Sequence, residues 1–145
     1  MVRKRTFDGL GRILTETQVL EEDQQAITFY EYDGLGNLAA IEVPNPSTGE
    51  GSSHIRYEQD YDGLGRMTRL TRPDNTGIRI EYSGLERTIR EETDDNSGSA
   101  RKERRDVFGR LVEVRELDPD AETAITQYSY DADDNLQKIV NADED

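Results

Sequence analysis

Two short segments of this sequence have residue types and spacing that suit ligand binding. Gly34-Leu35-Gly36-Asn37-Leu38-Ala39 fits the loose glycine pattern of dinucleotide-binding loops, in which backbone N–H groups hold a pyrophosphate. Asp131-Ala132-Asp133-Asp134-Asn135 is similar to the start of an EF-hand calcium loop. The first segment opens no convincing helix, and the second has Leu136 and Ala142 where the calcium loop needs Gly and Glu. Turns explain both segments better, and weak calcium binding by this cluster or by Asp94, Asp95 and Asn96 is the lesser alternative.

Catalytic arrangements are harder to build from these residues. His54 is the only histidine, the chain has no cysteine, and a serine triad would need Ser52 or Ser53 on a strand-turn-helix elbow that the sequence does not show. The 32 acidic residues are too numerous to single out the carboxylate pair that glycoside hydrolysis requires. We therefore expect no enzyme activity, no catalytic residue, no cofactor and no metal site. We expect His54 to lie in an exposed loop.

The tyrosines suggest a binding surface instead. Successive aromatic rings along a sheet can stack on sugars, but Tyr is also enriched in strands, where it packs against cross-strand neighbours. We favour packing and keep saccharide binding as the main functional alternative. The residues concerned are Tyr30, Tyr32, Tyr57, Tyr61, Tyr82, Tyr128 and Tyr130.

Composition limits the class of protein. The 145 residues are 34% charged and 32% hydrophobic, and the large aliphatic residues with Phe make up about a fifth of the chain, close to the level typical of disorder. Disorder is therefore a competing interpretation. The net charge of -14 would repel a nucleic-acid backbone, so we expect no nucleic-acid partner. No apolar run approaches the roughly 20 residues that span a bilayer, and no signal-peptide pattern is present.

The glycines belong to a sequence repeat. The hexapeptide Tyr61-Asp62-Gly63-Leu64-Gly65-Arg66 has close copies at residues 7–12 and 32–37 and weaker copies at 82–87, 105–110 and 130–135. A period near 25 residues is typical of repeat arrays. The longest step between copies contains the Pro-, Gly- and Ser-rich segment 43–53, which we interpret as a loop.

Short runs on both sides of each copy predict strands. Before the copies, segments such as Ile78-Arg79-Ile80-Glu81-Tyr82 alternate apolar and charged residues, which is typical of a half-buried strand. After the copies, apolar residues often fall three apart, as in Leu38 with Ile41 and Met67 with Leu70. This spacing leaves three alternatives: a strand covered on both faces, a bulge that shifts the phase, or one helical turn. The runs are too short for independent helices, so we favour strands.

The predicted unit is therefore strand, tight turn, strand and variable loop. Its repetition predicts an all-β fold of antiparallel β-hairpin repeats, about six units and about twelve strands, in a curved or spiralling sheet. We expect residues 1–145 to form a single array. In each turn we expect the Asp to accept backbone N–H bonds and Gly to supply a positive φ. The aromatic residue should face the Leu, Met or Ile across the hairpin base, and the Arg should pair with the Asp or with acidic residues of a neighbouring hairpin.

The Tyr-Asp-x-x-Gly-Arg pattern, with Tyr61-Asp62 and Gly65-Arg66 as the closest fit, resembles the YD repeat of the Rhs family, which includes bacterial toxin-complex shell proteins and teneurins. The resemblance covers essentially the whole chain. It implies hairpins that spiral side by side into a hollow shell, which in bacterial members encloses a toxic polypeptide. Ser83, Arg105, Asn37 and Asn135 depart from the pattern, and the Asp-Pro-x-Gly-Leu motif tied to cargo cleavage in bacterial shells is absent, since Asp118-Pro119 is followed by Asp120-Ala121.

We therefore expect a structural segment of an Rhs-type encapsulating shell, a fragment whose parent encloses a C-terminal toxin polypeptide. The alternative is a carbohydrate- or protein-recognition module on a cell or secreted surface, the location that the resemblance implies. Expected partners are neighbouring repeats, other copies that pair through the two unpaired terminal strands, and the parent's cargo. The expected turn residues are Phe7, Asp8, Gly11, Arg12, Tyr32, Asp33, Gly36, Tyr61, Asp62, Gly65, Arg66, Tyr82, Gly84, Arg87, Asp106, Gly109, Arg110, Tyr130 and Asp131.

Overall fold

The computed structural model describes residues 2–19, 25–45, 53–93, 98–117 and 123–141, and these ranges contain strands and turns but no helix. The all-β prediction of antiparallel hairpin repeats is therefore confirmed. The chain divides into two compact units, residues 1–74 and 75–145, which are described separately.

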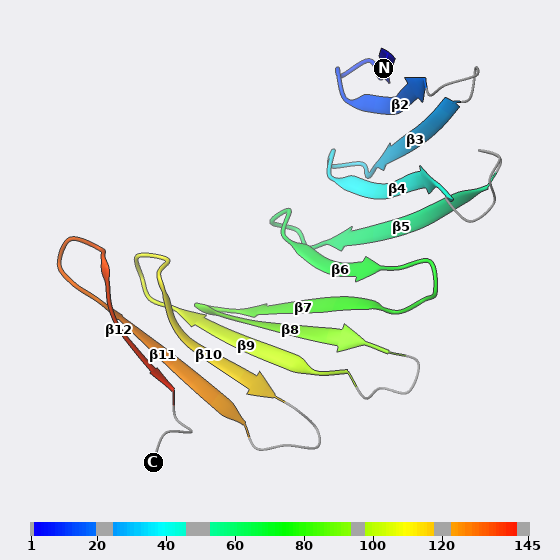
Figure 1. The fold of residues 1–145 in the computed structure, drawn as a ribbon. Coiled ribbons are helices and arrows are strands. Elements are labelled where there is room, and N and C mark those ends of the chain that lie inside the picture. Colours follow the sequence, from blue (N-terminus) through cyan, green and yellow to red (C-terminus); the bar gives the residue numbers. More distant parts are fainter. Residues whose placement is uncertain (1, 20–24, 46–52, 94–97, 118–122, 142–145) are drawn as a thin grey trace. The chain divides into compact units, whose positions relative to one another are not determined.

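The first unit contains β1 (Val2–Phe7), β2 (Ile13–Val19), β3 (Gln25–Tyr32), β4 (Leu38–Pro44), β5 (His54–Tyr61) and β6 (Met67–Thr71). Each strand pairs antiparallel with its neighbours in the chain (Figure 1, blue to green). The strands bracket the first three hexapeptide copies, so that each copy forms the turn of a hairpin.

The second unit contains β7 (Gly77–Ser83), β8 (Glu86–Glu92), β9 (Ala100–Arg105), β10 (Leu111–Leu117), β11 (Ala124–Tyr130) and β12 (Leu136–Asn141). These strands also pair antiparallel in chain order (Figure 1, green to red). The last three copies form the turns β7–β8, β9–β10 and β11–β12.

A β-bulge explains the three-residue apolar spacing. In the second hairpin Glu31 pairs with Ala40 and Tyr32 with Leu38, so Ala39 is the extra residue. Because a bulge counts two residues as one step, Leu38 and Ile41 lie on one face of the sheet. The same shift follows the turn in the first, third, fifth and sixth hairpins. The bulge is therefore the correct alternative of the three.

The fourth hairpin is built differently. β7 and β8 pair without a register shift from Gly77 and Glu92 to Ser83 and Glu86, which leaves a two-residue loop. Gly84, the first loop residue, has φ 61°, the conformation that a type II′ turn needs at this position. Ser83, in place of Asp, accompanies this tighter turn.

Segment 43–53 was predicted to be loop, and for its first residues this was wrong. β4 continues through Pro44, because Val43 pairs with Ile55 and Pro44 with His54. Pro44 is tolerated here because it is the last residue of the strand. Residues 46–52 lie outside the described residues, as do Asp94, Asp95 and Asn96.

The hydrophobic core is small. Among the described residues the buried apolar side chains are Ala40, Ile80, Ala100 and Val114, and none of the large side chains is fully buried. Glu103 and Glu113 are buried with them. Each unit is thus a single-layer sheet whose order depends on hydrogen-bonded ladders and on contacts between neighbouring hairpins rather than on a packed interior.

Both chain-terminal strands are sheet edges. Among the described strands β1 pairs only with β2, and β12 pairs only with β11. All residues of both strands are exposed. This agrees with the expectation of unpaired terminal edges, which are templates for association with another strand.

Candidate functional site

The most regular arrangement in the described residues is the Asp carboxylate at the centre of five of the six hairpin turns. In the third hairpin, Asp62 Oδ1 accepts hydrogen bonds from the backbone N–H groups of Leu64 (2.9 Å) and Arg66 (3.0 Å), and Oδ2 accepts one from Arg66 Nε (2.7 Å). The main chain closes the loop through Asp62 N–H to Arg66 O and Gly65 N–H to Asp62 O, both 2.9 Å. This is a three-residue loop with a type I turn followed by a left-handed residue.

Four other turns repeat these contacts. The carboxylates of Asp8, Asp33, Asp106 and Asp131 accept from the backbone N–H groups two and four residues ahead. The second carboxylate oxygen accepts from Arg12, Asn37, Arg110 or Asn135. Asn at the last position therefore replaces Arg without loss of the turn.

The fifth residue of the copy carries the unusual backbone angle in five of the six copies. Gly11, Gly36, Gly65 and Gly109 at this position have φ values of 80°, 91°, 74° and 84°. The earlier glycine of the first three copies, Gly9, Gly34 or Gly63, does not have positive φ. The sixth copy has Asp134 at this place with φ 65°, which costs energy for a residue with a Cβ atom.

The turn contacts lower the pKa values of the aspartates. The hydrogen bond from the Arg66 guanidinium, with that from the Arg66 backbone N–H, holds the pKa of Asp62 below its usual value of 3.8. At Asp131, where no Arg is present, the backbone and side-chain N–H groups of Asn135 lower the pKa. Burial alone would raise the pKa of Asp106, but the side-chain and backbone hydrogen bonds from Arg110 together outweigh burial, so the pKa lies below its usual value of 3.8. Each turn thus stabilises the ionised carboxylate.

The tyrosine of the second, third and sixth copies links its hairpin to the preceding one. The hydroxyl groups of Tyr32, Tyr61 and Tyr130 donate to the backbone carbonyls of Ile13 (3.0 Å), Leu38 (3.0 Å) and Leu111 (2.8 Å). Each acceptor directly follows the closing Arg or Asn of the preceding copy. Within its own hairpin the same aromatic faces the predicted apolar residue, as in Tyr61 opposite Met67.

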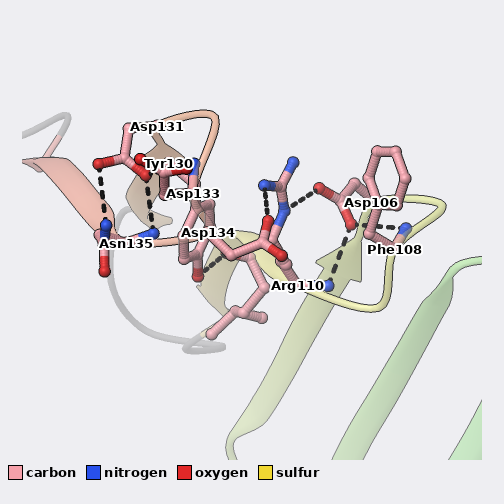
Figure 2. Close-up of polar contacts among 9 residues, drawn as sticks. Asp106, Phe108, Arg110, Tyr130, Asp131, Asp133, Asp134 and Asn135 are labelled. Atoms are coloured by element: carbon pink, nitrogen blue, oxygen red, sulfur yellow. Dashed lines mark hydrogen bonds and ion pairs between the residues drawn. The ribbon is translucent and has the colours of Figure 1, made fainter.

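The closing Arg completes this link. The Arg12 guanidinium carbon lies 4.5 Å from the Tyr32 ring centroid, and that of Arg110 lies 5.0 Å from the Tyr130 centroid. Figure 2 shows Arg110 between two turns, bound to Asp106 of its own turn and, at 2.6 Å, to Asp134 of the next. We call the Tyr hydroxyl bond and the Arg contact together the inter-hairpin latch.

Copies four and five lack parts of this arrangement. Arg105 stands where the latch needs an aromatic residue, and its Nη1 donates instead to Gly109 O at 2.8 Å. Arg87 Nε donates to the buried Glu103 at 2.8 Å. Tyr82 is half-buried at the end of β7. In the first copy Phe7 has no hydroxyl and is 55% exposed.

Sequence analysis missed two charge networks that hold neighbouring strands together. Arg56 contacts Glu31 (2.8 Å), Glu42 (2.7 Å) and Glu58 (2.9 Å), and these carboxylates raise its pKa. In the second unit Glu113 contacts Arg104 (3.2 Å) and Arg115 (2.7 Å), which lower its pKa although burial opposes the change. These ion pairs depend on the register between neighbouring strands, which the sequence does not reveal because the loops differ in length.

His54 was predicted to lie in an exposed loop, which is wrong. It begins β5, is half-buried, packs its ring edge-on against Phe29 at 5.1 Å, and places Nε2 3.1 Å from Ile27 O. His54 pairs with Pro44 at the end of the β4–β5 ladder, so the strand begins one residue earlier than the neighbouring serines suggest. Ser53 uses its backbone carbonyl to accept from Asn45 N–H, and Ser52 lies outside the described residues.

The other sequence candidates take structural places. Residues 34–37 of the dinucleotide-like pattern form the β3–β4 turn and Leu38 begins a strand, so no helix follows the glycines. Within the described ranges no group of three or more His, Asp or Glu side chains is arranged to hold a metal ion. All seven tyrosines are half-buried, so their rings are partly covered by neighbouring side chains.

A comparison with protein-family models gives no match to this chain, and a search of curated proteins finds no similar sequence. The part of the chain that the structure describes contains no helix that could span a membrane. The turns and latches therefore carry the functional argument by themselves.

Proposed function

We propose that the chain is a structural wall segment of an Rhs-type encapsulating shell, and that its parent protein encloses a C-terminal polypeptide, a toxin. The inter-hairpin latch is the observation that carries this proposal. It joins the first turn to the second, the second to the third and the fifth to the sixth through the Tyr hydroxyl, and at the first and last of these junctions also through the closing Arg. Contacts that repeat from hairpin to hairpin suit an array that is extended by adding copies.

The small core supports the same role. A single-layer sheet with few buried side chains leaves both faces open, as a wall between two compartments requires. The edge strands β1 and β12 offer unpaired backbone groups for the preceding and following hairpins of a longer array. The first Asp of each of the five Asp-containing turns accepts backbone and side-chain hydrogen bonds, which suits a structural role.

Proteolysis of the parent protein tests the proposal. The complete reading frame around this chain is expressed, and trypsin is added while fragments from the C-terminal side are followed by mass spectrometry. We expect the C-terminal polypeptide to survive until the hairpin repeats themselves are cut. Cleavage of that polypeptide at the rate of its isolated form would refute enclosure, as would a reading frame with no further copies.

Glycan titration separates the alternative of a recognition module. We expect no saturable binding to glycans by this chain. Saturable binding that disappears in folded Tyr57→Ala or Tyr61→Ala variants would show that the tyrosines recognise sugars and would contradict a purely structural role.

A further inference from the structure

The outer edge of β12 presents one half of an inter-hairpin junction, and the junctions within the chain show which groups complete the other half. We propose that β12 binds an extended strand of a partner polypeptide that carries a tyrosine and, three positions before it, an acidic residue. The partner strand would add antiparallel to β12, with backbone hydrogen bonds along the open edge. This interaction is additional to the proposed wall role and does not require an enclosed cargo.

Three junctions between consecutive hairpins share one register. In each, the residue eight positions after the first residue of a copy pairs with the residue three positions before the tyrosine of the next copy. The pairs are Thr15 with Phe29, Ala40 with Glu58, and Glu113 with Gln127. The loops at these junctions differ in length, so the register depends on the strands themselves. It therefore predicts how a further strand would align on β12.

The carbonyl of Leu136 specifies the tyrosine. At the three junctions the carbonyl six positions after the first residue of a copy accepts the hydroxyl of the next tyrosine, as Leu38 O does from Tyr61 at 3.0 Å. Leu136 holds this position in the sixth copy, and no hydroxyl of the described residues bonds its carbonyl. Among the described strands β12 pairs only with β11 (Figure 1, red), so its other edge is open to the tyrosine of a partner.

Lys138 specifies the acidic residue. It stands eight positions after Tyr130, so in the shared register it lies opposite the residue three positions before the tyrosine of the partner. Lys138 is exposed and forms no ion pair within the described residues. Because opposite charges directly across two strands attract and like charges repel, Glu or Asp is preferred at that position over Lys or Arg.

The sequence of β5 carries both groups. Glu58 stands three positions before Tyr61. Within the chain Tyr57 pairs with Ile41 of β4, and in the shared register it would pair with Ile139, which holds the equivalent place in β12. Ile139 is 54% exposed, so this contact would also remove apolar surface from water. A peptide of residues 54–61 is therefore a suitable model of the partner strand.

Strand β1 of a second copy is a poorer match. Lys4 stands three positions before Phe7, so the shared register would place it opposite Lys138. Phe7 has no hydroxyl to donate to the carbonyl of Leu136. A second copy can form the same backbone ladder through β1, but it supplies neither side-chain contact, so the preferred partner has a different sequence.

The test uses the intact chain and amide chemical shifts in ¹H–¹⁵N spectra. The probes are four acetylated and amidated peptides: residues 54–61, the same peptide with Tyr61→Phe, the same peptide with Glu58→Lys, and residues 1–7. We expect the unchanged peptide of residues 54–61 to shift the amides of β12 saturably, with a dissociation constant on the order of 1 mM or below. The Tyr61→Phe peptide should bind about two- to tenfold more weakly because it lacks the hydroxyl.

The other two peptides test the charge preference. The Glu58→Lys peptide and the peptide of residues 1–7 should each bind about threefold or more weakly than the unchanged peptide, because each places a lysine opposite Lys138. Binding of any of the three comparison peptides as tight as that of the unchanged peptide would overturn the proposal. Shifts in β1 instead of β12 would overturn it as well.

A charge exchange tests the register. In the Lys138→Glu chain the preference should reverse, so that the Glu58→Lys peptide binds about threefold or more tightly than the unchanged peptide. Lys4→Glu is the matched control, because it makes the same change of charge on the other exposed edge strand and should leave the preference as it is in the wild-type chain. A preference that does not reverse in Lys138→Glu, or that reverses equally in Lys4→Glu, would refute the proposed alignment.

Discussion

Replacing the two glycines of one turn by alanine separates backbone strain from every other effect of the change. Gly65 has φ 74°, and Gly63, two residues earlier in the same loop, lies outside the positive-φ region. An added Cβ atom meets no atom within 4 Å at Gly63 and only Asn37 Oδ1, at 3.5 Å, at Gly65. Both sites therefore accept the methyl group sterically, and the difference between the variants reports the backbone conformation.

The expected magnitude follows from two terms. Gly→Ala stiffens the unfolded chain at either position and stabilises the fold by about 0.4–1 kcal/mol where the native angles suit Ala. The left-handed conformation costs an L-residue about 1–2 kcal/mol, and only Gly65→Ala incurs this cost. Because the unfolded-state term is common to both variants, Gly65→Ala should be less stable than Gly63→Ala by about 1–2 kcal/mol.

Urea unfolding measures the difference. The chain has seven tyrosines and no tryptophan, so tyrosine fluorescence and circular dichroism report the transition. With an m-value of about 2 kcal/mol/M the two midpoints should differ by about 0.5–1 M. Gly65→Asn should fall between them, because Asn tolerates this conformation, as Asn75 does at φ 64°. Equal midpoints, or a lower midpoint for Gly63→Ala, would refute the assignment of the strained position.

Four further changes test the latch, the turn carboxylate, a loop and the sheet edge. Tyr61→Phe should lose about 0.5–1.5 kcal/mol of stability in urea unfolding because its hydroxyl bonds a backbone carbonyl, whereas Tyr57→Phe, whose hydroxyl makes no hydrogen bond within the described residues, should lose less. Because the pKa of Asp62 is lowered in the folded state, its ionised carboxylate contributes stability above pH 3.8, the usual value, and this stability is lost as the pH falls through the folded-state pKa. The loss of thermal stability in Asp62→Asn should therefore shrink on acidification. A loss that stays the same at all pH values would contradict this. Gly98→Ala should destabilise strongly in the same assay, because the added Cβ would collide with the backbone carbonyl of the facing strand. Ile139→Lys, at a 54% exposed edge position, should reduce concentration-dependent association in sedimentation velocity, and a wild-type chain that stays monomeric at all salt concentrations would refute edge pairing.

The sequence predicted the hairpins because their determinants are local. A turn needs its Asp and Gly within five residues, and the strand on each side alternates over only a few positions. The spacing of Leu38 and Ile41 also pointed to a bulge, but only as one of three alternatives. The choice among the three alternatives required the pairing partner, which the spacing alone does not name.

The contacts between hairpins could not be predicted from the sequence alone. The reach of Tyr61 to the carbonyl of Leu38 depends on how the second and third hairpins are aligned, and loops of unequal length set that alignment. The same dependence hid the pairing of Arg56 with Glu31 across twenty-five positions. His54 was misplaced because it follows a Ser-rich segment that suggested a loop, whereas the β4–β5 ladder extends to the pair of Pro44 and His54.

The latch defines the unit on which stability depends. Within a turn, the Asp–Arg pair is partly exposed, so solvent screens its attraction and the pair contributes mainly to the geometry of the turn. The Tyr hydroxyl and the stacked Arg instead join consecutive hairpins, and in linear arrays such nearest-neighbour terms decide how far order propagates. Between the fourth and fifth copies buried Glu103 faces Arg87 and accepts a hydrogen bond from it at 2.8 Å, so an ion pair takes the place of the aromatic at this junction of residues 75–145. Glu103→Gln should accordingly weaken the coupling of these hairpins, because it leaves Arg87 without its charged partner, so that hydrogen exchange in β9 becomes faster. Unchanged exchange in β9 would show that this pair does not couple the two hairpins.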